Sequence, residues 1–159
     1  MKFIDPNQDR WFAVSADEGV VPPAPDLLLE FAQWQEVRNH WPADVPVGVA
    51  LPNDVPVTEI AADLDRLQLV VLRYPKWTDG RAYSQAHLLR ARYRYAGEVR
   101  ATGDVLVDML PLLHRTGFDA VVLRTGQSVD AARRALGYFP SYYQGDVHEP
   151  RPRFAREAA

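Results

Sequence analysis

The chain has 159 residues, of which 47% are hydrophobic and 25% charged, and its formal net charge is −3. These values suit one globular domain and argue against general nucleic-acid binding, which needs a basic surface excess. The absence of cysteine excludes disulfides, thiolate nucleophiles and cysteine-ligated zinc or iron–sulfur clusters within the chain. No apolar run has the length of a secretory signal core or a membrane span. We therefore expect a soluble, cytoplasmic protein that binds neither nucleic acid nor membrane.

The N-terminal region predicts a strand, a turn and a second strand. Two short apolar segments, Phe3–Ile4 and Trp11–Val14, flank a run of turn-forming residues from Asp5 to Asp9. Aspartate, proline and asparagine favour turns because of their backbone and side-chain hydrogen-bonding preferences. We expect these two segments to form a small N-terminal hairpin.

A helix is predicted after the proline-rich segment 22–25, which cannot itself be helical. Asp26 can cap this helix, and apolar residues continue at helical spacing to about Arg38. Trp41 and Pro42 follow the last helical residue, so the helix should end before them.

From Val45 onward, strand patterns alternate four times with helical patterns. Three of the strands are short apolar runs, whereas Glu98–Thr102 alternates polar and apolar residues, so we expect one face of that strand to lie outside the main core. The predicted strands cover residues 47–51, 69–72, 98–102 and 120–123, and the predicted helices cover residues 58–67, 81–95, 104–116 and 128–136. Pro111 lies inside the third of these helices and should kink or break it. Gly117 follows that helix and is a typical C-cap residue.

Four consecutive strand–helix units predict an α/β fold whose parallel strands are joined by right-handed crossovers. We favour half of a (β/α)8 barrel, because the units have similar lengths and show no switch in strand order. The alternative is an open doubly wound sheet. The concave face of a half barrel needs a cover, which could be the N-terminal hairpin and helix, the aromatic C-terminal stretch or a second subunit in a homodimer. We assign residues 1–145 to one domain and the charged, proline-bearing residues 146–159 to a flexible tail.

In both architectures the loops that follow the strands meet at one edge, where α/β folds bind their ligands. This edge would gather the cationic side chains of Arg73, Lys76, Arg81, Arg100 and Arg124. With the helix N-termini, they would suit an oxyanion, a phosphate-bearing ligand or an acidic protein surface. The competing interpretation is that the arginines form ordinary ion pairs with aspartates in the same loops; these aspartates are Asp54, Asp79 and Asp104.

The segment Tyr74–Gln85 is the densest run of polar and aromatic residues in the chain. Trp77 could stack on a planar ligand or a partner side chain, or it could anchor the core. Asp79 could cap the following helix or orient Arg81. The candidate ligand-binding or partner-binding residues are Lys76, Trp77, Asp79, Arg81, Tyr83, Ser84, Gln85, Arg100, Asp104 and Arg124.

Motifs of common active sites are absent from the sequence. No two of the four histidines have metal-ligand spacing, so we expect no metal site. The sequence contains no Gly-x-Ser-x-Gly elbow, no phosphate-binding loop and no dinucleotide fingerprint. The residues therefore identify no catalytic group and no cofactor.

The run Tyr74–Ala86 is similar to the signature of the bacterial domain-of-unknown-function 934 family. Three later blocks, Gly103–Leu106, Gly117–Ala120 and Tyr142–Gly145, resemble the same family, so the resemblance extends over most of the chain. Ala82 differs from the glycine expected after the arginine. Family members carry the description of probable oxidoreductases involved in sulfite reduction. The resemblance therefore implies a role in sulfur assimilation, and it supplies no catalytic residues.

Three functions compete. An accessory protein would dock sulfite reductase or its electron donor, or bind a small oxyanion. An enzyme, a candidate oxidoreductase, would bind an anionic substrate at the same edge. A flavin- or dinucleotide-binding reductase component is the least favoured, because no fingerprint supports it. An enzyme should place Lys76, Asp79, Arg81 and Arg100 around one closed pocket, whereas a docking protein should display Lys76, Trp77 and Arg81 outward on a flat patch.

Overall fold

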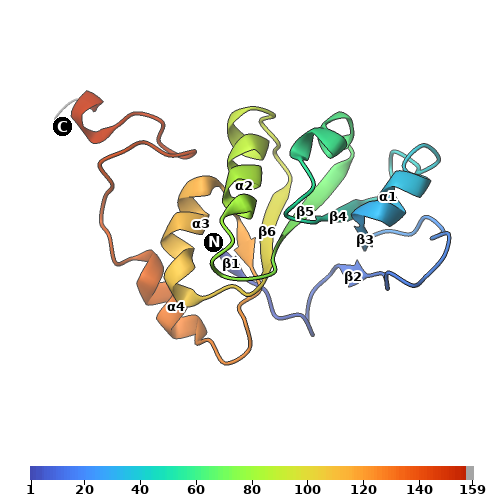
Figure 1. Cartoon of the computed structure of the whole chain (residues 1–159), viewed down its shortest axis with the longest axis horizontal. Coiled ribbons are helices and arrows are strands. Elements are labelled where there is room, and N and C mark those ends of the chain that lie inside the picture. Colours follow the sequence, from blue (N-terminus) through green and yellow to red (C-terminus); the bar gives the residue numbers. More distant parts are fainter. Residues whose placement is uncertain (157–159) are drawn as a thin grey trace.

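The computed structural model describes residues 1–156 and contains one sheet of parallel strands with helices packed along it (Figure 1). The strands are β1 (Lys2–Phe3), β2 (Phe12–Ala13), β3 (Leu27–Glu30), β4 (Val47–Leu51), β5 (Leu67–Tyr74), β6 (Glu98–Gly103) and β7 (Ala120–Val121). The α-helices are α1 (Phe31–Val37), α2 (Arg81–Ala91), α3 (Leu110–Thr116) and α4 (Val129–Leu136), and the 3-10 helices are η1 (Val57–Asp63), η2 (Val107–Met109) and η3 (Arg153–Ala155).

The predicted half barrel is confirmed. The strand order is β1-β7-β6-β5-β4-β3-β2, and every neighbouring pair is parallel. Strands β3 to β7 therefore follow one another in chain order, without the reversal that an open doubly wound sheet requires. The carboxyl ends of these strands meet at one edge, and this edge carries the loops predicted to hold the site.

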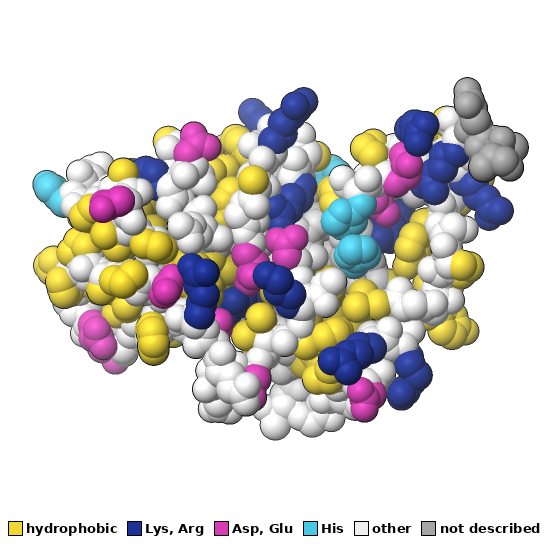
Figure 2. Space-filling model, turned by 180° about the vertical axis from the view of Figure 1, so that it is seen from behind, with side chains coloured by type: hydrophobic (Ala, Val, Ile, Leu, Met, Phe, Trp, Pro, Cys, Tyr) yellow, Lys and Arg dark blue, Asp and Glu magenta, His cyan; other side chains and the backbone are white. Residues whose placement is uncertain are grey.

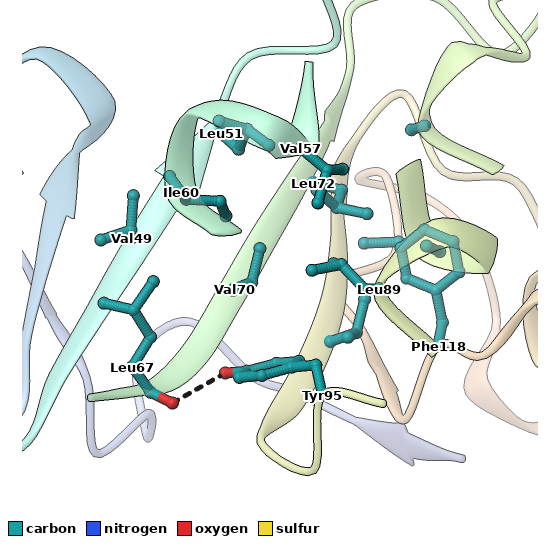
Figure 3. Close-up of a cluster of buried hydrophobic side chains, with 14 of the residues drawn as sticks. Val49, Leu51, Val57, Ile60, Leu67, Val70, Leu72, Leu89, Tyr95 and Phe118 are labelled. Atoms are coloured by element: carbon teal, nitrogen blue, oxygen red, sulfur yellow. Dashed lines mark hydrogen bonds between the residues drawn. The ribbon is translucent and has the colours of Figure 1, made fainter. Parts of the chain in front are cut away.

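Strand β5 lies at the centre and is buried on both faces, which is why its sequence is almost continuously apolar. Val70 and Leu72 pack with Leu89 of α2 and with Phe118 on the helix-covered face, as Figure 3 shows. At the start of β5, the hydroxyl of Tyr95 donates to the carbonyl of Leu67 at 3.1 Å. Because helices cover the convex face completely, a polar substitution at Val70 or Leu72 has no solvent to reach.

The N-terminal strand, turn and strand are confirmed, but the two strands do not pair with each other. β1 pairs with β7 and β2 pairs with β3, at opposite edges of the sheet. The connecting residues 4–11 cross the concave face, where Trp11 packs on Ala50, Leu69 and Val71. The N-terminal region thus covers part of the concave face.

The helix predicted over residues 26–38 begins later than expected, and its first residues form a strand instead. Leu27–Glu30 pairs with β4 as strand β3, and the helix starts at Phe31. Asp26 has a φ of 60° and so does not cap the helix. The Gln33 side chain accepts a hydrogen bond from the Glu30 amide at 2.9 Å and takes over the capping role.

The helix predicted over residues 104–116 begins at Val107 as η2 and continues as α3. Pro111 therefore stands in the first turn of α3, where its missing N–H costs nothing, and it does not kink the helix. Gly117 ends α3 with a φ of 108°, as the sequence predicts. The predicted helices over residues 58–67 and 81–95 are shorter than expected, since η1 ends at Asp63 and α2 ends at Ala91.

The C-terminal segment returns to contact α3. Val147 donates a backbone hydrogen bond to Arg115 at 3.3 Å, and the Arg115 side chain lies 3.4 Å from the Asp146 carboxylate. The tail predicted over residues 146–159 is described as far as Arg156, and its last three residues lie outside the described residues. No helix between residues 1 and 156 has the length and apolar character needed to cross a membrane.

Replacing Val71 with aspartate should prevent cooperative folding. Val71 is 2% exposed in the central strand, so the substitution would bury an unpaired charge. Gln68→Asp, at an exposed position of the same strand, is the matched control and should fold normally. Thermal unfolding followed by circular dichroism checks both, and a Val71→Asp protein that melts cooperatively near the wild-type midpoint would contradict this sheet assignment.

Replacing Gly103 with alanine should destabilise the protein by roughly 1–3 kcal/mol. Gly103 has a φ of 96°, and a Cβ atom there would overlap the carbonyl oxygen of Tyr74. Gly126→Ala is the control, because Gly126 also has a positive φ, of 85°, but has open space around it. Urea unfolding should show a larger loss for Gly103→Ala; equal losses would mean that the overlap with Tyr74 has no effect.

Candidate functional site

The loop after β5, residues 75–80, is held in place by a carboxylate from the loop that follows β6. Asp104 Oδ2 accepts a hydrogen bond from the Trp77 amide at 3.0 Å, and Asp104 Oδ1 accepts one from Arg124 Nη1 at 2.9 Å. The amide of Asp104 also donates to the Tyr74 carbonyl at 2.8 Å. One aspartate therefore joins the loops that follow β5, β6 and β7.

Asp79 fixes the other end of this loop. Its carboxylate lies 2.7 Å from Arg81 Nη2, accepts from the Arg81 amide at 3.2 Å and accepts from Asn53 Nδ2 at 2.7 Å. Hydrogen bonds from the Arg81 side chain and backbone lower the pKa of Asp79 to about 2. Asp79 is therefore ionised at neutral pH, and it both orients Arg81 and accepts a hydrogen bond at the start of α2, the two roles considered from the sequence.

Two of the predicted site residues are used by the fold itself. Gln85 is buried, and its amide donates to the carbonyls of Pro52 and Val55 at 2.9 and 2.7 Å, which ties α2 to the loop after β4. Tyr83 is half-buried, with its ring edge-on to Tyr74 at a centroid distance of 5.3 Å. Burial raises the pKa of the Tyr74 phenol far above its usual value, so Tyr74 is uncharged and the two rings contribute to packing.

Arg100 does not reach the strand-end edge. It is 3% exposed on the concave face, where it donates to Glu98 at 2.7 and 2.9 Å and also to Asp9. Asp9 comes from the N-terminal segment that crosses this face. The charged group predicted as part of a ligand site therefore fastens the N-terminal segment to the sheet. Asp9 was expected only as a turn residue, because no local pattern links it to a strand 91 residues away.

Ion pairs also occupy the other predicted arginines. Arg81 pairs with Asp79 and Arg124 with Asp104, as the competing interpretation proposed. Arg73 instead pairs with Glu30 at the end of β3. Among residues 1–156, Lys76 is the one member of the predicted cationic set that forms no ion pair. The edge is therefore a set of charge pairs with one unpaired lysine, and it lacks the concentrated positive charge that an oxyanion would require.

The side chains of Lys76, Trp77 and Arg81 point outward and form what we call the docking face. Trp77 is 54% exposed, and Lys76 and Arg81 are exposed beside it. Ser84, also predicted as a site residue, is exposed in the first turns of α2. Of five cavities of about 380 to 510 Å³ on the described surface, none is lined by any residue of the docking face. The arrangement matches the outward patch expected of a docking protein.

One cavity lies where the interior of a full barrel would be, and the sequence did not predict it. It has a volume of about 490 Å³ and lies between the N-terminal crossing and the sheet, with Trp11, Phe12, Val71 and Thr102 among its walls. Its existence depends on the path of residues 4–11 over the concave face, which no local pattern reveals. Within residues 1–156, no group of three or more histidine, aspartate or glutamate side chains is placed to hold a metal ion.

Comparison with known proteins identifies one family. The family model described as "Bacterial protein of unknown function (DUF934)" matches residues 48–154, from β4 through the C-terminal segment. No curated protein matches the chain. The family match covers well over half of the 159 residues and includes the docking face. The chain therefore belongs to the DUF934 family of bacterial proteins.

Proposed function

We propose that the protein is an accessory protein of assimilatory sulfite reduction that binds a partner protein through its docking face. The observation that carries this proposal is the exposed position of Trp77 on a loop fixed by hydrogen bonds, with the exposed side chains of Lys76 and Arg81 on the same loop and at the start of the following helix. The family resemblance suggests sulfite reductase or its electron donor as the partner.

The residue types of the docking face favour protein recognition. Tryptophan and arginine are enriched among the residues that dominate binding energy in protein interfaces. A tryptophan that is more than half exposed leaves a large apolar area in water, and a pocket on a partner could bury that area. Lys76 and Arg81 lie at its rim, where charges guide association and orientation.

Hydrogen bonds within the chain also hold the loop in one conformation in the absence of a partner. Asp104 holds the Trp77 amide, and Asp79 holds Arg81 through two side-chain nitrogens and the backbone amide. A preorganised loop loses less conformational entropy on binding than a mobile one. The Asp79 carboxylate stays ionised far below neutral pH because its pKa is about 2, so this restraint is present under all physiological conditions.

An oxidoreductase with an anionic-substrate site at the same edge is the alternative proposal, and it has less support. Arg81 and Arg124 already have carboxylate partners, and an anionic substrate would have to displace or approach those carboxylates. Arg100, which such an enzyme would need at this edge, lies on the concave face instead. A small oxyanion could still bind through Lys76 and the exposed hydroxyl of Ser84, but these two groups alone form a weak site.

Trp77→Ala should weaken binding to the partner by roughly thirtyfold, the loss typical of an interface hot spot. Binding of purified sulfite reductase, and separately of its electron donor, can be measured by biolayer interferometry with this protein immobilised. Leu88→Ala removes a 39%-exposed side chain farther along α2 and is the matched control. Equal affinity of wild type and Trp77→Ala for a partner that does bind would contradict the proposal.

The Lys76→Ala, Arg81→Ala double variant should fold normally and fail to support growth on sulfite in a strain that lacks the native protein. Both side chains are exposed, so their truncation should leave the melting temperature almost unchanged. Arg92→Ala, at an exposed position beyond the end of α2, should restore growth fully. Full restoration by the double variant would exclude the docking face as the functional surface.

A further inference from the structure

Acidic and basic residues are unevenly distributed along the chain. Residues 11–66 contain ten aspartates and glutamates but only two arginines and no lysine, whereas the rest of the chain has a basic excess. The acidic region comprises β2, β3, α1, β4 and η1, which lie together at one end of the long axis of the molecule (Figure 1). The segment after α4, residues 138–156, which we call the arm, extends at the opposite end.

The arm presents aromatic side chains to solvent. Tyr143 is 68% exposed and Phe154 is 73% exposed, and their ring centroids lie 5.8 Å apart. A backbone hydrogen bond of 2.8 Å from Arg153 to Tyr143 holds the two ends of the arm together. Arg115 anchors the arm to α3 by stacking on Tyr142, with its guanidinium carbon 4.2 Å from the ring centroid. The aromatic surface is therefore held outward by defined contacts.

Unpaired positive charge lies beside these aromatic rings. The two carboxylates of the arm are already used, since Asp146 pairs with Arg115 and Glu149 pairs with Arg151. Arg153 and Arg156 have no ion-pair partner among residues 1–156. Figure 2 shows the resulting group of basic side chains at the end of the molecule that carries the C-terminus. An acidic surface with exposed apolar groups would complement it.

The opposite end of the same molecule has that character. Phe12 is 66% exposed and Val20 is 84% exposed, and the exposed carboxylates of Asp17 and Glu18 lie between them in sequence. The turn that carries them is fixed to α1, because Gln33 donates to the Ser15 carbonyl at 2.8 Å. We call these four residues, Phe12, Asp17, Glu18 and Val20, the acidic end. The arm cannot reach the acidic end of its own chain, because the two lie at opposite ends of the long axis (Figure 1).

We propose that two copies of this chain associate side by side in antiparallel orientation, each laying its arm on the acidic end of the other. A two-fold axis satisfies both contacts at once and closes the assembly, as most homodimers do. Opposite charges set the orientation and contribute a salt-sensitive part of the stabilisation, without which burial of Tyr143, Phe154, Phe12 and Val20 is insufficient to hold the dimer. The contact uses neither Trp77 nor its neighbours, so it is separate from the docking face.

Light scattering coupled to size-exclusion chromatography tests this arrangement. Wild type at low ionic strength should have twice the chain mass of 18.0 kDa, and the dimer should dissociate as salt screens the charges. The Arg153→Glu, Arg156→Glu variant and the Asp17→Arg, Glu18→Arg variant should each be monomeric, because like charges then face one another. Mixed in equal amounts, the two variants should form a dimer, since both contacts are again complementary.

Two further variants separate the contact from general charge effects. Tyr143→Ser with Phe154→Ser should be monomeric although every charge is retained. Arg134→Glu with Arg92→Glu changes the net charge as much as the arm variant does, at exposed positions outside both surfaces, and should remain dimeric. Wild type that is monomeric at every concentration, or reversed variants that do not dimerise when mixed, would overturn the proposal. Unchanged binding of sulfite reductase by the monomeric variants would show that the two surfaces act independently.

Discussion

The structure depends on the burial of β5 on both of its faces. A parallel strand at the centre of a curled sheet cannot leave either face in water, because the run Leu69–Leu72 in its middle is entirely apolar. On the convex side, the helices that follow each strand supply the cover. On the concave side, a half barrel has no opposite wall, and the chain must provide one from elsewhere. The N-terminal segment does so with Trp11 over Leu69 and Val71.

The N-terminal segment that covers the concave face also supplies a partner for the buried arginine of the sheet. A buried arginine needs carboxylates, since an unpaired charge in such a place is costly. Arg100 has Asp9 and Glu98, one from the crossing segment and one from its own strand. The ion pair thus fastens the N-terminal cover across the concave face. With the concave face largely used for packing, the exposed loops at the strand ends are left as the surface available to a partner.

At those loops, each exposed arginine forms an ion pair with a neighbouring aspartate, so little net positive charge remains. Asp79 and Asp104 accept hydrogen bonds from backbone amides as well as from arginines, so each carboxylate stabilises a loop and neutralises a guanidinium. The result is an ordered rim whose exposed groups include Trp77, Lys76 and the ion-paired Arg81. Such a rim is better suited to shape and apolar recognition of a protein than to the capture of a free anion.

Much of the architecture could be predicted from the sequence, because strands and helices of the repeated units have local signatures. The four strand segments, the parallel order and the C-cap at Gly117 all follow from residue type and spacing. The strand at Leu27–Glu30 was missed, because its leucines also fit a helical pattern and its pairing with β4 is a tertiary contact. The partners of β1 and β2 could not be predicted either, since they are set by how the sheet closes.

The candidate site shows the same division between local and long-range information. The two interactions of Asp79 with Arg81, one with its amide and one with its side chain, span two residues and are readable in sequence. Arg100 lies on the concave face, where it pairs with Asp9, a residue distant in the chain. The Gln85 side chain is buried because it donates hydrogen bonds to carbonyls of the loop after β4. Sequence patterns therefore predicted that this loop follows β5 at the strand-end edge, but they overestimated how many of its charges are free.

We propose above all that the ordered loop carrying Trp77 binds a protein partner. Hydrogen–deuterium exchange of residues 75–81, measured for the protein alone and in the presence of purified sulfite reductase or its electron donor, tests it most directly. The account predicts slow exchange at the Trp77 and Arg81 amides in the free protein, and a further slowing confined to this loop in the complex. Stable binding with unchanged exchange across residues 75–81 would contradict it and would place the contact on another surface.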